Sequence, residues 1–476
     1  MSKILMVASE ATPFAKTGGL ADVIGALPRA LNSLGDEAAV VLPLYPSAQQ
    51  FLGNASRVYD GLQLWLGSRR ISVDIRLLVQ DGVPFYFVDC PPLYARDGIY
   101  GTQAGDYPDN HIRFAALCYA ALGIVRYLFR PDIIHCHDWQ TAVLAPLVKF
   151  RFAGDPTFLG PKTLLTIHNL GYQGLFPRSA LSDIGLDPGL FHMRALEFYG
   201  QVNFLKGGIL FSDALSTVSK GYAKEIQTPE HGFGLDDLLR ERSASLTGIV
   251  NGVDYGEWSP EQDTYIAVNY SRADLSGKKT CKRDLLATFG LPAGEAEMHR
   301  PLLGIVSRFA GQKGFDLIEA IAEDLAAEDV SLVVIGSGEA RYENVFRSLA
   351  VTHPDRFAVK VGYSEEIAHK VEAGADMFLM PSRYEPCGLN QIYSLRYGTV
   401  PIVRATGGLD DTIDKETGFK FREYSGLALL EAIRAALALY RDKKSWREMM
   451  ANGMKKNFSW DASAAEYSAL YRRLIG

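Results

Sequence analysis

Residues 301–315 read PLLGIVSRFAGQKGF, an apolar run that passes into a loop of glycines and basic residues and then into a helical pattern. The run 301–307 is apolar on both faces, which is typical of a buried parallel strand. Residues 3–8 begin the same arrangement near the N-terminus, with a Gly-containing loop and a helix at 20–34. Because the strand-loop-helix pattern starts twice, the sequence predicts two doubly wound α/β domains that resemble Rossmann folds.

The other apolar runs alternate with longer helical patterns in the same way. The further predicted strands are 38–42, 132–135, 163–168, 214–218, 331–336, 357–361, 377–381 and 399–403. The segment 251–263 is rich in Gly, Asp and Pro and lacks periodicity, so we expect a hinge at or just before it. We predict a first domain at 1–245, a second at 246–457, and an amphipathic C-terminal helix within 458–476 that can cross back onto the first.

Length and composition exclude several classes of protein. The chain has 476 residues, which is too many for one ordinary core. Its net charge of -6 and the absence of a Lys/Arg block argue against nucleic-acid binding and favour small molecules or neutral polymers as partners. We expect no signal peptide, and no apolar run reaches the roughly 18 residues needed to cross a membrane. The five cysteines are scattered and form neither a disulfide framework nor a CxxC pair, so we expect a reduced, cytoplasmic protein.

The first loop contains Lys16-Thr17-Gly18-Gly19, with Asp22 three residues further on. Glycines let the backbone approach a ligand, and the start of a helix favours phosphate. Lys16 would add a positive charge. The loop matches neither GxxxxGK[ST] nor GxGxxG, which disfavours an ATPase or a dehydrogenase. A helix-capping turn with an exposed lysine is the alternative interpretation.

The second half places charged residues and glycines after three predicted strands. Arg308 and Lys313 follow the strand 301–307 and could hold a diphosphate as it departs, although two solvated surface charges are the alternative. Glu385 lies in PSRYEPCGLNQ, residues 381–391, where a carboxylate could bind sugar hydroxyls or cap a helix. Thr406-Gly407-Gly408 repeats the Gly-Gly pattern of the first loop, and its N–H groups could cradle a phosphate.

Two histidine-containing segments end strands of the first half. They are HCHDWQ at 135–140 and TIHN at 166–169. His135 and His137 alternate on one strand face, as zinc ligands can, but the spacing supplies no third ligand. We predict that His137, Asp138, His168 and Asn169 bind a hydroxylated substrate. Hydrogen-bonded structural histidines are the alternative.

Taken together, several segments resemble bacterial glycogen synthases and plant starch synthases. They are KTGGLADVIGALP, HCHDWQ, TIHNLGYQG, GIVNGVD, SRFAGQKG, PSRYEPCGLNQIYSLRYGT and TGGLDDT, in the family's order, and the tail FSWDASAAEYSALYRRL also fits. The resemblance implies a GT-B fold, in which two Rossmann-like domains face a central cleft. It further implies transfer of glucose from ADP-glucose to the non-reducing end of an α-1,4-glucan such as glycogen, with retention and without a metal ion or other cofactor.

The resemblance also assigns roles to residues. It implies that the catalytic residues are His168, Glu385, Arg308 and Lys313, with the two cations binding the departing diphosphate. The donor-binding residues that it implies are Lys16, Gly18, Gly19, Asp22, Asp138, Asn169, Asn251, Cys387, Gly388, Leu389, Thr406, Gly407 and Gly408. Tyr393 departs from the wider GT-B pattern, because it stands eight residues after Glu385 where many such enzymes carry a second Glu.

Two other classes of protein stay open on sequence alone. One is another GT-B enzyme, such as a sucrose or trehalose-phosphate synthase or a sugar-nucleotide epimerase. The other is a glucan-binding protein without activity, against which the presence of Lys16, Arg308, Lys313 and Glu385 argues. No motif by itself distinguishes adenine from uracil in the donor.

Overall fold

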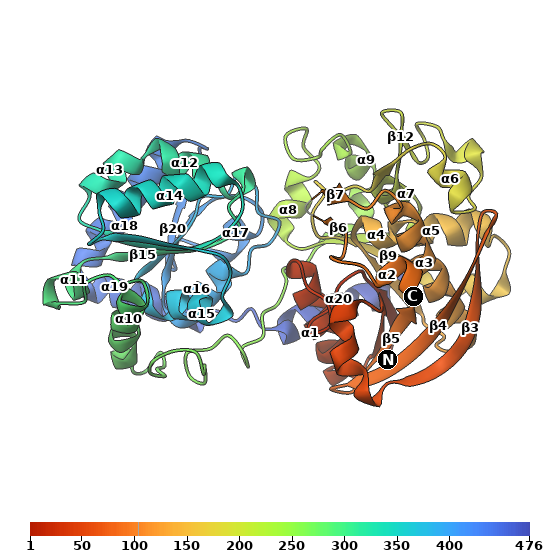
Figure 1. The fold of residues 1–476 in the computed structure, drawn as a ribbon, viewed down its shortest axis with the longest axis horizontal. Coiled ribbons are helices and arrows are strands. Elements are labelled where there is room, and N and C mark those ends of the chain that lie inside the picture. The colour runs from red at the N-terminus through yellow and green to blue at the C-terminus, as the bar shows by residue number, and fades with distance from the viewer. Residues whose placement is uncertain (103) are drawn as a thin grey trace. The chain divides into compact units, whose positions relative to one another are not determined.

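The computed structural model describes residues 1–102 and 104–476 and divides into two compact units (Figure 1). Unit 1 comprises Met1–Val218, Ala223–Gly252 and Trp460–Gly476. Unit 2 comprises Ser219–Tyr222 and Val253–Ser459. Each unit has its own mainly parallel sheet with helices on its faces. The predicted α/β class with two Rossmann-like domains is confirmed.

Unit 2 has a six-stranded parallel sheet in the order β17-β16-β15-β18-β19-β20. Its strands are β15 (Leu302–Val306), β16 (Ser331–Gly336), β17 (Phe357–Val361), β18 (Met377–Met380), β19 (Val400–Arg404) and β20 (Phe419–Phe421). Counted along the chain, this is the order 3-2-1-4-5-6 of a Rossmann fold. The strand order reverses between β15 and β18, and ligands of such folds bind outside the carboxyl ends of the strands at this point.

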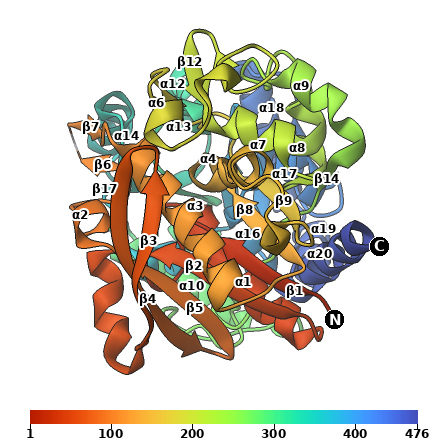
Figure 2. The ribbon, with the colours of Figure 1, turned by 90° about the vertical axis from the view of Figure 1, so that its right-hand side faces the viewer.

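Unit 1 has a nine-stranded sheet in the order β14-β13-β9-β8-β1-β2-β5-β4-β3. The parallel strands are β1 (Lys3–Val7), β2 (Glu37–Pro43), β5 (Val83–Asp89), β8 (Ile133–His137), β9 (Lys162–Ile167), β13 (Ala214–Thr217) and β14 (Leu246–Gly248). They follow the same Rossmann order, with its reversal between β1 and β8. An antiparallel hairpin of β3 (Ser56–Leu66) and β4 (Arg69–Gln80) extends the sheet beyond β5 (Figure 2).

Helices connect the strands in both units. Those of unit 1 are α1 (Gly19–Ser33), α2 (Pro91–Tyr94), α3 (Asn110–Tyr127), α4 (Asp138–Ala142), α5 (Leu144–Pro146), α6 (Ala180–Asp183), α7 (Phe204–Phe211), α9 (Asp236–Glu241) and α20 (Trp460–Ile475). Those of unit 2 are α10 (Ser276–Thr288), α11 (Glu295–His299), α12 (Phe315–Ala320), α13 (Ala322–Ala327), α14 (Ala340–Thr352), α15 (Glu365–Gly374), α16 (Asn390–Tyr397), α17 (Gly407–Thr412), α18 (Gly426–Arg441) and α19 (Lys443–Lys455). The short helix α8 (Lys220–Glu225) lies where the chain passes between the units.

The C-terminal helix α20 belongs to the core of unit 1. It packs on α1, and in Figure 1 it is the blue helix among the red and orange elements. Tyr467 and Tyr471 are fully buried in one cluster with Ile4, Met6 and Val40 of the sheet. The Tyr471 hydroxyl also lies 2.9 Å from Nδ1 of His135 on β8. The last helix therefore supports the central strands of unit 1 directly.

The structure moves the ends of several predicted strands by one or two residues and adds other strands. The strand predicted at 132–135 continues to His137, so the prediction that His135 ends it was wrong. The hairpin β3–β4 and strand β5 were not predicted. β3 has a shifted register against β4 at Arg57, Tyr59 and Leu62, which breaks the alternation that marks a strand in sequence. Over the part of the chain that the structure describes, no helix combines the length and the apolar character needed to cross a membrane.

Candidate active site

The loops that follow β15 and β18 in unit 2 meet through an ion pair. Lys313 Nζ lies 2.6 Å from Glu385 Oε2, and the Ser382 hydroxyl donates to the same oxygen at 3.0 Å. Glu385 is only 5% exposed. A buried carboxylate is stable only when it is paired and hydrogen-bonded, and these two partners supply both conditions. The ion pair thus joins two sequence-predicted residues at the point where the strand order reverses.

Arg308 lies on the same edge of the sheet and presents an exposed guanidinium group. The neighbouring Phe309 is fully buried, and its backbone bonds to Ser337 and Glu339 after β16 hold the loop in place. Among the residues that the structure describes, Arg308 forms no ion pair. A fixed backbone with an available guanidinium group is suited to bind an anion such as a phosphate.

Two of the predicted glycines in unit 2 are required by the fold itself. A Cβ atom on Gly408 would lie 2.1 Å from the carbonyl oxygen of Cys387, and the Gly408 N–H donates to the Glu385 carbonyl at 3.0 Å. Gly388 has a φ of 70°, which disfavours any side chain. The loop after β19 therefore packs closely on the loop that contains Glu385. This packing brings Thr406, Gly407, Gly408, Cys387, Gly388 and Leu389 to one place.

Cys387 is buried, as is each of the other four cysteines, and none of these five described residues forms a disulfide. This agrees with its interpretation as a packing residue.

In unit 1, a residue that the sequence analysis missed holds the predicted glycine loop. Glu10, 3% exposed, accepts hydrogen bonds from the Thr17 hydroxyl at 2.7 Å and from the Gly18 N–H at 3.3 Å. It also accepts from the Thr17 N–H and the Tyr100 hydroxyl. Its position three residues after β1, in the same loop, was the available signal. Glu10 therefore fixes the conformation of the loop at Thr17 and Gly18.

The same loop leaves open space above its glycines. A Cβ atom on Gly18 or Gly19 would meet no atom within 4 Å, so packing within the protein does not require glycine there. Lys16 Nζ lies 2.8 Å from Asp22, which pairs two predicted residues. The space above Gly18 and Gly19 is consistent with the close approach of a ligand to the backbone.

The loops after β8 and β9 are joined by Asp138. Its Oδ1 atom accepts hydrogen bonds from the backbone N–H groups of His168 at 2.7 Å and Asn169 at 3.4 Å. Asp138 has a φ of 56°, an uncommon conformation for a residue other than glycine, and such strain concentrates at functional sites. Burial raises the pKa of the Asp138 carboxyl to about 7 despite these hydrogen bonds.

Three histidines form a buried cluster beside Asp138. His137 Nδ1 lies 3.0 Å from His168 Nε2, and the rings of His135 and His137 lie 4.1 Å apart. Burial lowers the pKa of His135 and of His168 to about 3 and holds that of His137 well below its ordinary value. All three rings are therefore neutral near pH 7. His135 bonds Tyr471 and Thr166 through its two nitrogens, so it has no nitrogen left for the zinc ion considered from the sequence.

Comparison with known proteins places this geometry in a family. Residues 3–241 match the starch synthase catalytic domain, and residues 292–455 match the glycosyl transferases group 1. The glycogen synthase of Koribacter versatilis is 52% identical over 99% of this chain and 98% of its own. The chain belongs to the glycogen and starch synthase family. The glycogen synthase of Anaeromyxobacter sp. strain Fw109-5 is 47% identical over 99% of both chains.

Solved structures agree with this family assignment. The catalytic domain of starch synthase IV from Arabidopsis thaliana, bound to ADP and acarbose, is 32% identical with a TM-score of 0.90. It covers 100% of this chain and 99% of its own. The sucrose-phosphate synthase of Thermosynechococcus elongatus, 18% identical with a TM-score of 0.61, shares the fold alone. The chain is thus a hexosyltransferase of the GT-B class.

Within each unit, the strand order brings most, but not all, of that unit's predicted residues together. In unit 1 the residues from Lys16 to Asp22 follow β1, while Asp138, His168 and Asn169 follow the adjacent strands β8 and β9. Asn251 instead follows β14 at the end of the sheet, two strands beyond β9. It is buried, and within the described chain its Oδ1 atom has no hydrogen-bond partner.

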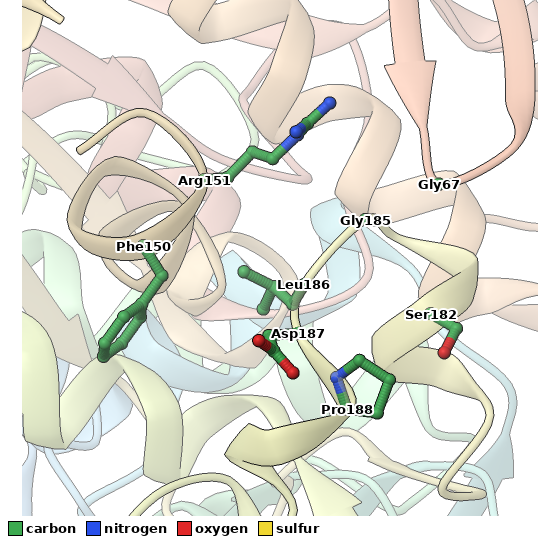
Figure 3. Close-up of a pocket in the computed structure, with 8 residues that line it drawn as sticks. All are labelled: Gly67, Phe150, Arg151, Ser182, Gly185, Leu186, Asp187 and Pro188. Atoms are coloured by element: carbon green, nitrogen blue, oxygen red, sulfur yellow. The ribbon is translucent and has the colours of Figure 1, made fainter. Parts of the chain in front are cut away.

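A hollow of about 560 Å³ lies elsewhere in unit 1 (Figure 3). It is lined by Gly67, Phe150, Arg151, Ser182, Gly185, Leu186, Asp187 and Pro188, none of which was predicted as a site residue. Figure 3 shows the Arg151 side chain extending away from Asp187. Gly67, in the β3–β4 turn, approaches α6 so closely that a Cβ atom on Gly67 would lie 2.2 Å from the carbonyl oxygen of Ser182. The hairpin turn therefore packs directly on α6 at one side of the hollow.

The raised pKa of Asp138 gives a pH-dependent prediction. Because the folded-state pKa of about 7 lies above the ordinary value of 3.8, the native state becomes less stable as pH rises from about 4 to 7. Asp138→Asn keeps an acceptor oxygen and tolerates a positive φ, but it carries no charge. We expect this variant to be more stable than the parent chain at pH 8, with a smaller difference at pH 5. Thermal unfolding at both pH values measures this, and a pH-independent difference would contradict it.

Proposed function

We propose that the chain transfers glucose from ADP-glucose to the non-reducing end of an α-1,4-glucan, with release of ADP and retention at the anomeric carbon. The observation that carries this proposal is the Lys313–Glu385 ion pair beside the exposed Arg308, at the reversal of the unit 2 sheet. The relatives named glycogen synthase and the starch synthase bound to ADP and acarbose support the donor and the acceptor class.

Unit 2 supplies the charges that cleavage of the glucosyl bond needs. As the bond breaks, negative charge grows on the departing diphosphate and positive charge grows on the sugar. Arg308 and Lys313 stabilise the diphosphate. Glu385 accepts from Lys313 and so orients its ammonium group. The N–H groups of the Cys387–Leu389 turn donate to sugar hydroxyls, and the Thr406–Gly408 turn lies near the distal phosphate and ribose.

Unit 1 supplies neutral hydrogen-bonding groups for the glucose. Because the pKa of His168 is lowered to about 3, its ring is an uncharged donor and acceptor at neutral pH. Asp138 fixes the backbone of His168 and Asn169, which holds the ring and the carbonyl groups in place. An uncharged histidine does not repel the positive charge that develops on the sugar. The open backbone at Gly18 and Gly19 lets a ligand approach unit 1 closely.

Retention is proposed to arise from attack on the same face of the sugar as the departing diphosphate. Double displacement would need a carboxylate on the opposite face as nucleophile. Oε2 of Glu385 is already bound to Lys313 and Ser382, and we assign the carboxylate to holding Lys313 in place. In our proposal the acceptor hydroxyl gives its proton to a phosphate oxygen of the donor while it attacks. A glucosyl group trapped on a side-chain carboxylate would contradict this step. The proposed reaction requires no metal ion.

Initial rates with matched donors and acceptors test the proposed function. We expect glucose from ADP-glucose to enter glycogen or maltooligosaccharides, at a higher rate than glucose from UDP-glucose at equal concentration. Fructose 6-phosphate and glucose 6-phosphate should accept none. Transfer only to a sugar phosphate would place the chain with another GT-B activity, and a complete lack of turnover would favour a glucan-binding protein.

The substitution Lys313→Gln tests the role of the ion pair, because glutamine still donates to the buried Glu385 but lacks the charge. We expect the glucosyl-transfer kcat/KM to fall about 100-fold or more, as for the loss of one transition-state donor, and we expect Tm to fall as well, because the buried Glu385 loses its counter-charge.

Lys282→Gln is the matched control for that variant. Lys282 pairs with Asp376, also at 2.6 Å, but Asp376 binds the first N–H of β15 and so lies at the opposite edge of the sheet. We expect this control to lose stability and to keep a nearly normal kcat/KM. Nearly normal turnover in Lys313→Gln would remove Lys313 from the mechanism.

A further inference from the structure

Three side chains in unit 2 converge at a point apart from the residues assigned to glucosyl transfer. Glu257 lies in the segment 251–263, before α10, and Glu365 and His369 lie one turn apart on α15. Each offers one possible metal-ligand atom, and these atoms lie within 4.8 Å of one another. One imidazole and two carboxylates are a ligand set that zinc uses in proteins.

The imidazole of His369 has an unused nitrogen at this point. The side chain is fully buried, yet within the described residues its Nε2 atom has no hydrogen-bond partner. Glu365 Oε1 lies 3.7 Å from it, which is too long for a hydrogen bond. Buried polar atoms in proteins nearly always form hydrogen bonds, so a buried nitrogen that forms none and faces two carboxylates requires an explanation.

The other side of the His369 ring has the environment of a metal-binding histidine. Its Nδ1 atom lies 2.8 Å from Asp263 Oδ2, and Asp263 is itself 4% exposed. The Tyr397 hydroxyl donates to the same carboxylate oxygen at 2.5 Å. A carboxylate on one ring nitrogen fixes that nitrogen as the N–H donor, and a metal ion can replace the proton on the other nitrogen.

Stacked aromatic rings fix the direction of Nε2. The ring of Trp258 lies 3.7 Å from that of His369, with an angle of 18° between their planes. On its other side Trp258 stacks on Tyr393 at 3.9 Å and 8°. The imidazole is therefore held between the stack and Asp263, and it cannot rotate freely. Preorganised ligands of this kind reduce the cost of binding an ion.

We propose that Glu257, Glu365 and His369 form a binding site for a zinc ion or a similar divalent transition-metal ion. Two ligand atoms on one tetrahedral zinc ion lie about 3.4 Å apart, close to the 3.7 Å between His369 Nε2 and Glu365 Oε1. Glu257 is exposed, so its carboxylate can move the roughly 1 Å that closure of the set requires. Water would fill the fourth position.

The site bears on the position where this chain departs from the wider GT-B pattern. Tyr393 lies on α16, whose first residue, Asn390, follows the loop that contains Glu385. A bound ion would hold His369, and through the stack of Trp258 and Tyr393 it would brace this helix. The ion is assigned to that bracing role and takes no part in glucosyl transfer.

Metal titration of the full chain tests the proposal. The protein is first treated with a chelator, and zinc chloride binding is then measured by calorimetry and by elemental analysis after dialysis. We expect saturable binding of one ion that Glu257→Gln and Glu365→Gln each weaken by about 10-fold or more. Glu366→Gln is the matched control, because Glu366 lies on the same helix but pairs with Lys370 at 3.0 Å. It should bind zinc as the parent chain does.

Cobalt(II) substitution gives a second measurement, because the visible spectrum of a tetrahedral site with nitrogen and oxygen ligands lacks the intense charge-transfer bands of thiolate ligands. We expect the spectrum of a tetrahedral site with nitrogen and oxygen ligands, and we expect Glu257→Gln and Glu365→Gln to lose it. The absence of saturable zinc binding would overturn the proposal. It would equally be overturned by binding that both variants retain, since another group of histidines or cysteines would then hold the ion.

Discussion

The parallel order of the central strands constrains every part of the proposed chemistry. In a parallel sheet all strands end at the same edge, so loops far apart in sequence meet where the strand order reverses. In unit 2 this places Arg308 and Lys313, after β15, beside Glu385, after β18. In unit 1 it places the Lys16–Asp22 loop, after β1, next to Asp138, after β8.

The two units place different electrostatics at these edges. Unit 2 gathers charges, and the buried Glu385 is stable only because Lys313 and Ser382 bind it. Unit 1 gathers histidines that burial keeps neutral, together with Asp138, whose charged form burial disfavours. A reaction that separates a diphosphate from a glucosyl group with carbocation character is stabilised by cations at the diphosphate, and uncharged groups at the sugar do not repel its developing positive charge. The charged groups of unit 2 and the neutral groups of unit 1 therefore fit the roles that we propose, which are diphosphate binding and glucose binding.

The sequence was sufficient to predict the α/β class and the central strands, because buried parallel strands leave continuous apolar runs. It was also sufficient to select residues that the strand order brings together, such as Lys313 with Glu385 and Asp138 with His168. The sequence could not predict contacts between residues far apart along the chain, since no local pattern marks the hydrogen bond between His135 and Tyr471 on the last helix. It could not distinguish Gly408, which packing requires, from Gly18 and Gly19, which have open space above them. Glu10 was missed because its role depends on how the loop after β1 folds back on it.

The central claim is retaining transfer of glucose to the non-reducing end of an α-1,4-glucan, and the product of a single transfer tests it most directly. Maltotriose and ADP-glucose labelled with carbon-13 at the anomeric carbon are incubated with the full chain, and the product is examined by nuclear magnetic resonance. We predict one labelled α-anomeric signal, in a terminal glucose joined through oxygen 4 of the former non-reducing end. A labelled β-anomeric signal, or a label attached at another hydroxyl group, would contradict it.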